Sequence, residues 1–367
     1  MKMKTRSAWD NLSLYESTEL LKVFHKERFK REINTGKAYE IASHISQGRE
    51  YFESASVSSP LVKPLLIYYG VLALSRALIL FSNEKNRESS LAQSHGLTAL
   101  NWNKTLSSGI QNLDKIEIRA EGGGTLSQLI DVQNVHELWI NNINPLFPYM
   151  PIKLTNVSWN KSFTLNLDDL LARTPELIST YLKVMGQKPK CRKARVALDV
   201  SDISDLSSAG NKAALATANM GAGFEDFEEI KKYFKIPEIS SSRIDHTFFN
   251  QDIRAVSIIT EFNIESIRDM NSLFLSCEDL NDIYENNMDG YLVFNLNSGA
   301  KLSKLTRMYC LSYTLGMLVR YNPTSWSSLI NKRSGDKYLP LLKSATEMLE
   351  SLFPEAILFH LQGHRNL

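Results

Sequence analysis

The feature that most constrains this chain is an apolar run from Pro64 to Phe81. Apolar residues recur in it at the spacing of one helix face, and the opposite side is apolar as well. A helix that is apolar nearly all round is buried, so the run predicts the central helix of the fold. Pro64 suits a first-turn position, and Ser58 and Ser59 before it offer capping hydroxyls. The helix is therefore expected to begin near residue 60.

The same run is short for a membrane span, which needs about twenty apolar residues, and Arg76 and two tyrosines interrupt it. We therefore predict no membrane association. Arg76 lies on the face that is predicted to meet the core, where a charged side chain is rare unless it is paired. Two explanations are open: a structural ion pair or a guanidinium that reaches the rim, and a residue of a functional site.

The composition is that of an ordinary globular protein of 367 residues, with 43% hydrophobic and 22% charged residues and a formal net charge of +2. The small net charge argues against nucleic-acid binding by the whole surface and leaves local patches open. Cys191, Cys277 and Cys310 are widely separated, which supports neither a disulfide framework nor a zinc site. The charged N-terminus lacks the apolar run of a signal peptide. We expect a cytoplasmic protein without a metal or another cofactor.

Periodicity along the chain predicts a mainly α fold of the α+β class, with a helical-bundle core and a small β-sheet in the middle third. We expect an N-terminal helical bundle in residues 1–115, a mixed α+β region in residues 116–300, and C-terminal helices in residues 301–367 that pack back on the bundle. Runs that are compatible with strands, or rich in β-branched and aromatic residues, mark the expected strands: Ile116–Arg119, Val196–Val200, Ala255–Thr260 and Gly290–Asn295.

Two apolar stretches are expected to close the chain as helices. The first, Leu302–Val319, should end near Arg320, because Pro323 cannot donate to a helix and biases Asn322 away from helical geometry. The second covers residues 339–361, with a break at Pro354.

Two segments of unusual composition suggest binding. Residues 188–195 hold the densest positive patch, five basic residues of eight, and are candidates for phosphate contacts: Lys188, Lys190, Arg192, Lys193 and Arg195. Acidic stretches between residues 221 and 289 offer the alternative that opposite charges satisfy each other. The triple glycine at 122–124 lacks the Gly-Lys-Ser/Thr ending of a phosphate loop and is interpreted as a turn or a helix start.

Several segments share one resemblance: the central run with the later His95-Gly96-Leu97, the stretch Leu315–Trp326, Trp9 with Leu12, Tyr51-Phe52, and Leu167–Glu176. Together they resemble the YaaC-like family of bacterial proteins. The resemblance runs over most of the chain. Its motifs are core helices and turns, and it implies no particular biochemical activity.

The central helix, with Tyr68-Tyr69 and Arg76, followed by His95-Gly96, is more remotely similar to the HEPN superfamily. Members of that superfamily are helical bundles and include ribonucleases of toxin–antitoxin and antiviral systems. The similarity implies a HEPN-like bundle and metal-independent RNA cleavage. In that reaction a histidine exchanges protons with the 2′-hydroxyl and the leaving group, while an arginine stabilises the phosphorane.

The candidate catalytic residues follow from this similarity. The superfamily motif has four to six residues between the arginine and the histidine, whereas seven residues separate Arg87 from His95 here. The candidate set is therefore His95 with Arg76 or Arg87, completed by Arg320 and Tyr321. A role of His95 as a turn or cap residue is the alternative.

Three functions remain open, since fold alone does not choose among them. The first is a binding or regulatory scaffold that works with partner proteins of a bacterial defence or stress system. The second is a divergent HEPN-like ribonuclease acting on RNA, with a homodimer as one way to complete its site, so that enzymatic activity is itself an open question. The third is a nucleotide sensor that uses the triple-glycine turn.

Overall fold

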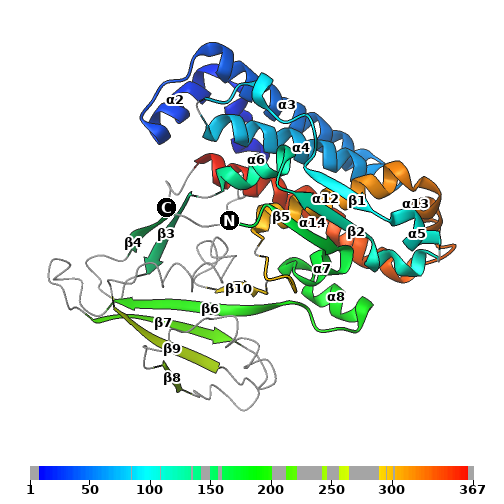
Figure 1. The fold of residues 1–367 in the computed structure, drawn as a ribbon. Helices are drawn as coiled ribbons and strands as arrows, with labels where there is room; N and C mark the ends of the chain where they lie inside the picture. The colour runs from blue at the N-terminus through cyan, green and yellow to red at the C-terminus, as the bar shows by residue number, and fades with distance from the viewer. Residues whose placement is uncertain are drawn as a thin grey trace, which may run out of the picture.

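The computed structural model describes residues 8–83, 85–107, 109–133, 135–141, 149–155, 159–200, 212–220, 242–245, 256–263, 289–294, 296–300 and 302–362. The described chain is mainly helical with antiparallel sheets, as predicted (Figure 1). The HEPN-like character of the bundle stays a prediction.

The helices fall into three groups along the chain. The N-terminal group consists of α1 (Ala8–Leu12), α2 (Thr18–Phe29), α3 (Thr35–Val57) and α4 (Lys63–Ser82). The middle group consists of α5 (Trp102–Ser107), α6 (Gly124–Val132), α7 (Leu167–Ala172) and α8 (Ile178–Met185). The C-terminal group consists of α12 (Lys304–Tyr321), α13 (Pro323–Ile330) and α14 (Leu339–Gln362). Short 3-10 helices join them: η1 (Ser13–Glu16), η2 (Glu88–Ser90), η3 (Ile110–Lys115), η4 (Pro175–Leu177) and η8 (Asp336–Tyr338).

Helix α4 is the predicted central helix, and it packs against α3, α6, α12 and α14. Pro64 lies in its first turn as predicted, but the helix begins at Lys63, and Ser58 belongs to the C-cap of α3. By length and composition α4 could cross a membrane; however, 72% of its most apolar window is buried inside the protein. Packing in the core therefore accounts for its apolar composition.

Helix α12 approaches α4 unusually closely at Gly316. A Cβ atom added there would lie 2.7 Å from the Cβ of Tyr68, closer than real side chains pack. Because of this contact, α12 packs closely against α4 at Tyr68. Figure 1 shows α12 beside α4, with α14 below them.

The prediction of a break at Pro354 is wrong, because α14 continues through this residue. Proline removes one donor from a helix, which usually kinks or ends it. Here Phe353 and Ile357 on either side are fully buried and Pro354 itself is buried, so packing holds the helix together across it.

The strands form three antiparallel sheets. One sheet has the order β1 (Leu97–Leu100), β2 (Glu117–Glu121), β5 (Ser162–Asn166), with Leu97 opposite Ala120 and Ile118 opposite Leu165. A hairpin pairs β3 (Val135–Asn141) with β4 (Tyr149–Thr155). The largest sheet has the order β10 (Asp289–Val293), β6 (Cys191–Val200), β7 (Lys212–Met220), β9 (Val256–Asn263), β8 (Ser242–Asp245).

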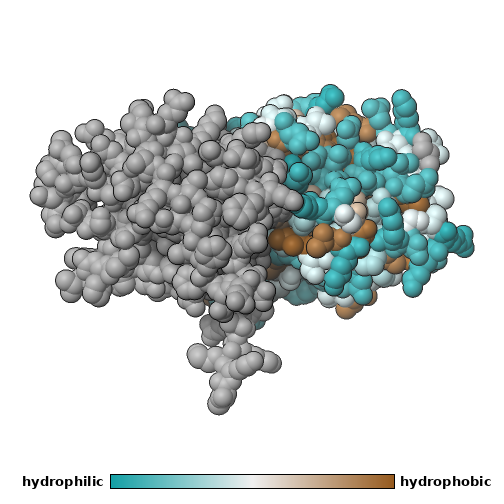
Figure 2. Space-filling model, turned by 90° about the horizontal axis from the view of Figure 1, so that it is seen from below, coloured by the Kyte–Doolittle hydropathy of each residue, from teal (hydrophilic) through white to brown (hydrophobic). Residues whose placement is uncertain are grey.

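Each of the four predicted strand runs overlaps a strand, namely β2, β6, β9 or β10. The run Val196–Val200 lies wholly inside β6, whereas the other three extend one or two residues beyond the strand. The largest sheet lies on the opposite side of the molecule from α2, α3 and α4 in Figure 1. The functional residues that sequence analysis proposed are thus divided between these two sides. Figure 2 shows one face on which the described surface is mostly hydrophilic, with a short band of hydrophobic residues beside the grey ones.

Candidate functional site

The loop that carries His95 is fastened to the start of α6. The backbone N–H groups of Thr125 and Leu126 donate to the carbonyls of Ser94 and His95, at 2.9 and 3.2 Å. Gly96 and Gly124 have φ values of +84° and +75°, and a Cβ on either one would overlap the backbone of the facing glycine turn. The triple glycine thus forms a turn at the start of α6, in which Gly124 packs against Gly96. The amide N–H groups of Thr125 and Leu126 are occupied by the protein's own carbonyls.

The imidazole of His95 lies half-buried among tyrosines of α4 and α12. Its Nδ1 is 2.6 Å from the hydroxyl of Tyr68, and the tautomer decides which of the two donates. The Tyr309 hydroxyl donates to the carbonyl of His95, and the Tyr313 hydroxyl to that of Leu97, both at 3.0 Å. No described residue pairs with Nε2 of His95, and this nitrogen is not among the buried atoms without a partner. Nε2 is therefore open to a ligand.

Two arginines bring positive charge to this histidine. Arg76 of α4 donates from Nη2 to the carbonyl of Ala92 at 3.4 Å, and its buried Nε has no hydrogen-bond partner. Arg320 of α12 donates from Nη1 to the hydroxyl of Tyr69 at 3.2 Å. Within the part of the chain that the structure describes, neither guanidinium forms an ion pair with a carboxylate. We name His95, Tyr68, Arg76 and Arg320 the His95 site.

The electrostatics of the site follow from this arrangement. Partial burial, then the charges of Arg76 and Arg320, lower the pKa of His95 below its ordinary value of 6.5, so that the imidazole is neutral near pH 7. Burial raises the pKa of Tyr68 and Tyr309, and that of Tyr313 to about 12. The tyrosines therefore remain hydrogen-bond donors at any physiological pH.

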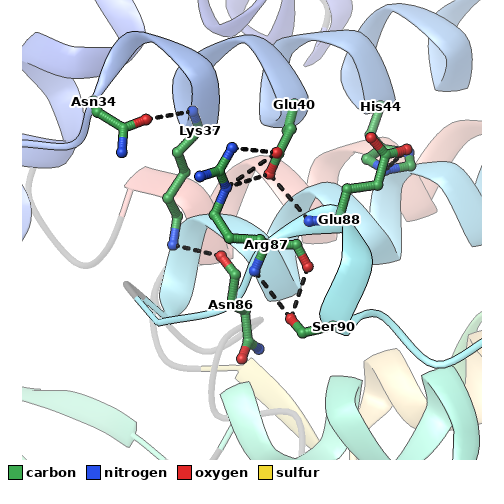
Figure 3. Close-up of polar contacts among 8 residues, drawn as sticks. All are labelled: Asn34, Lys37, Glu40, His44, Asn86, Arg87, Glu88 and Ser90. Atoms are coloured by element: carbon green, nitrogen blue, oxygen red, sulfur yellow. Dashed lines mark hydrogen bonds and ion pairs between the residues drawn. The ribbon is translucent and has the colours of Figure 1, made fainter.

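Arg87, the third predicted arginine, lies elsewhere. Its guanidinium pairs with Glu40 of α3: Nε is 3.0 Å from each carboxylate oxygen, and Nη2 is 2.5 Å from Oε1 (Figure 3). The N–H of Glu88 donates to the same carboxylate at 3.1 Å, and Lys37 donates to the carbonyl of Asn86. These bonds fasten residues 85–90, which we name the Arg87 segment, to α3. The structure brings Arg76 and Arg320 to His95 but does not bring Arg87 there.

The basic residues 188–195 lead into β6. Lys188 and Lys190 precede the strand, and Arg192, Lys193 and Arg195 lie within it. Arg195 stands directly opposite Asp289 in the register of β6 and β10. Phosphate contacts by these basic residues stay a prediction.

Among the described residues, no group of three or more His, Cys, Asp or Glu side chains is arranged to hold a metal ion. Cys191 and Cys310 are buried thiols that are not part of a disulfide. Cys277 lies outside the described residues.

Sequence analysis missed the tyrosines that surround His95, namely Tyr68, Tyr309 and Tyr313. The available signal was the four-residue spacing of Tyr309 and Tyr313, which places both on one face of α12. Only the packing of α12 on α4 brings that face to His95.

The comparisons with known proteins identify a family. The model of the YaaC-like protein family matches residues 13–361 of the chain, which is nearly its whole length. No curated protein and no solved structure matches. The chain thus belongs to the YaaC-like family.

Proposed function

We propose that this protein binds a phosphate-bearing ligand at the His95 site, as a cytoplasmic binding or regulatory protein that works with partner proteins of a bacterial defence or stress system. The observation that carries the binding proposal is Arg76. A partly buried guanidinium whose Nε has no partner, and which no described carboxylate neutralises, lacks the compensation that such groups normally have.

An anion supplies that compensation. Guanidinium groups bind phosphate through paired, charge-assisted hydrogen bonds, and Arg76 and Arg320 approach His95 from different helices. The open Nε2 of His95 adds a further polar contact. The carboxylate of Glu88, which belongs to the Arg87 segment, lies 3.6 Å from Nε2 of His44 (Figure 3).

A binding measurement tests this proposal. Isothermal titration of the purified chain with inorganic phosphate and with pyrophosphate is expected to show saturable binding. Arg76→Gln should weaken it at least about tenfold, the usual scale for loss of a charge-assisted hydrogen bond. Arg87→Gln is the matched control, since that arginine already has Glu40, and it should bind like the unchanged protein. Absence of binding to the unchanged protein, or equal losses in both variants, would contradict the proposal.

An exposed apolar corner supports the proposal of a protein partner. Val57, Leu61 and Val62, where α3 turns into α4, are 87%, 39% and 45% exposed. Adjacent apolar side chains in solvent are typical of contact surfaces. Light scattering should show that the chain self-associates, or chemical cross-linking in cells should capture a reproducible partner protein. Val57→Lys should abolish whichever of these two associations is observed. A monomer that cross-links to nothing would contradict this part of the proposal.

RNA cleavage at the same site is a second candidate, favoured by the neutral His95 beside two arginines. A neutral imidazole can accept the 2′-hydroxyl proton, and an arginine can stabilise the phosphorane. RNA integrity in cells that express the protein, with or without its genomic neighbours, tests this function. Degradation that disappears in His95→Ala and persists in Arg87→Gln is the expected result; intact RNA in every strain would exclude it.

A further inference from the structure

We propose that the ligand of the His95 site is a nucleotide, whose base stacks on a rim of tyrosines around Arg320. This inference rests on the proposed phosphate site, and it adds the uncharged part of the ligand, which is the base. We name Tyr51, Tyr69 and Tyr321 the tyrosine rim.

Arg320 joins the rim to the phosphate site. Its Nη1 donates to the hydroxyl of Tyr69 at 3.2 Å, and its guanidinium carbon lies 5.1 Å from the ring centre of Tyr321. Its charge also acts on His95. A ligand that reaches from Arg320 to His95 therefore has aromatic rings along one side.

The rings of the rim are arranged as a stacking surface. Tyr51 of α3 and Tyr69 of α4 are stacked, with centroids 5.6 Å apart and planes at 29°. Tyr69 is tilted against Tyr68, which bonds His95, at 5.8 Å. The rim is therefore continuous with the phosphate site through the Tyr68-Tyr69 pair.

Tyr321 is the open member of this surface. It follows Arg320 directly at the end of α12 and is 62% exposed, although large aromatic side chains in a folded protein are usually well covered. An exposed tyrosine beside an arginine without a carboxylate is the combination with which proteins stack bases and hold the backbone phosphate of nucleic acids. A planar base with a phosphate one sugar away matches both features.

The first experiment compares three ligands of increasing size by isothermal titration: inorganic phosphate, ribose 5-phosphate and adenosine monophosphate. Stacking on an aromatic side chain contributes about 1–3 kcal/mol per base. We therefore expect adenosine monophosphate to bind about tenfold more tightly than ribose 5-phosphate. Equal affinities for these two ligands would overturn the nucleotide inference while leaving the phosphate site intact. Failure of all three to bind would overturn the proposed function itself.

A tetranucleotide of 2′-O-methyl RNA, which cannot be cleaved through its 2′-hydroxyl, separates the two sources of a nucleotide. Tighter binding than the mononucleotide assigns the site to an RNA strand, and weaker binding assigns it to a free nucleotide. Both results support a base-stacking rim.

The second experiment removes the open ring. Tyr321→Ala should reduce adenosine monophosphate binding to the affinity of ribose 5-phosphate and leave phosphate binding unchanged. Tyr39→Ala is the matched control, since Tyr39 is similarly exposed, at 67%, on α3. Equal effects of the two substitutions, or loss of phosphate binding in Tyr321→Ala, would contradict the stacking role.

Discussion

The Arg87 segment lies between Arg76 and His95 in the chain, but its arginine differs from the arginines of the His95 site in the partners that it has. Arg87 has a bidentate carboxylate partner in Glu40, and neighbouring backbone groups complete the network. Among the described residues, Arg76 and Arg320 have only a carbonyl and a tyrosine hydroxyl as hydrogen-bond partners. The first arrangement fastens a loop to a helix, and the second leaves positive charge available. Pairing therefore distinguishes a structural arginine from a candidate binding residue better than distance along the sequence does.

The largest expected effect is on stability, and it compares a glycine of the His95 loop with a glycine of α3 beside Arg87. Gly96→Ala adds a Cβ at a positive φ and into the backbone of Gly123, so the free energy of unfolding should fall by about 3 kcal/mol or more. Gly36→Ala is the control: its new Cβ would meet the flexible end of Arg87 at 3.3 Å, within a helix that favours alanine. Urea unfolding should show a change of less than about 1 kcal/mol for this variant. Similar losses in both would mean that the loop is not held as described.

The next contrast concerns a charge without a partner. Arg76→Met removes a partly buried guanidinium and keeps a good helix former, so the unfolding free energy should stay constant or rise by about 1 kcal/mol while phosphate binding is lost. Arg87→Met should lower stability instead, because it leaves Glu40 without its partner. Urea unfolding of both variants measures whether the unfolding free energy rises or falls in each. A clear loss of stability in Arg76→Met would identify this residue as structural.

A smaller effect concerns the protonation of His95. Its pKa is lowered in the folded state, so the unfolded chain binds the proton more tightly, and this contribution to stability decreases as the pH falls below the ordinary 6.5. NMR titration of the imidazole should place its pKa below 6.5. Arg76→Met should raise that pKa, whereas Arg87→Met should not change it. An ordinary pKa in the unchanged protein would contradict the partial burial of His95 and the effect of the two arginine charges on it.

The smallest expected effect belongs to the paired region. Hydrogen bonds from Arg87 are the main cause that lowers the pKa of Glu40, against a smaller opposing effect of burial. The pair therefore stabilises the fold above the ordinary pKa of 4.5, and this contribution is lost as the pH falls below it. Glu40→Gln should remove part of the acid sensitivity of unfolding, by a small amount because Arg87 is exposed. Acid unfolding curves that superimpose would contradict a role for this pair.

The sequence predicted the central helix, the C-terminal helices and four strands, because apolar periodicity and proline positions act locally. It also singled out His95, Arg76 and Arg320, which the fold brings together. The partner of Arg87 was not predictable, since Glu40 lies 47 residues away and nothing local links the two. The tyrosines of α12 reach the loop across more than 200 residues, as the bond from Tyr309 to His95 spans 214. The continuity of α14 through Pro354 likewise depends on tertiary packing.

The contact of Gly96 with the glycine turn at the start of α6 also has a kinetic consequence. Backbone bonds from Thr125 and Leu126, together with the hydroxyl of Tyr309, fix the His95 loop before any ligand arrives. A ligand that meets a site already in its final geometry has no loop to order, so little conformational entropy is lost on binding. Association should then proceed in a single step, with an observed rate that rises linearly with ligand concentration and does not reach a plateau.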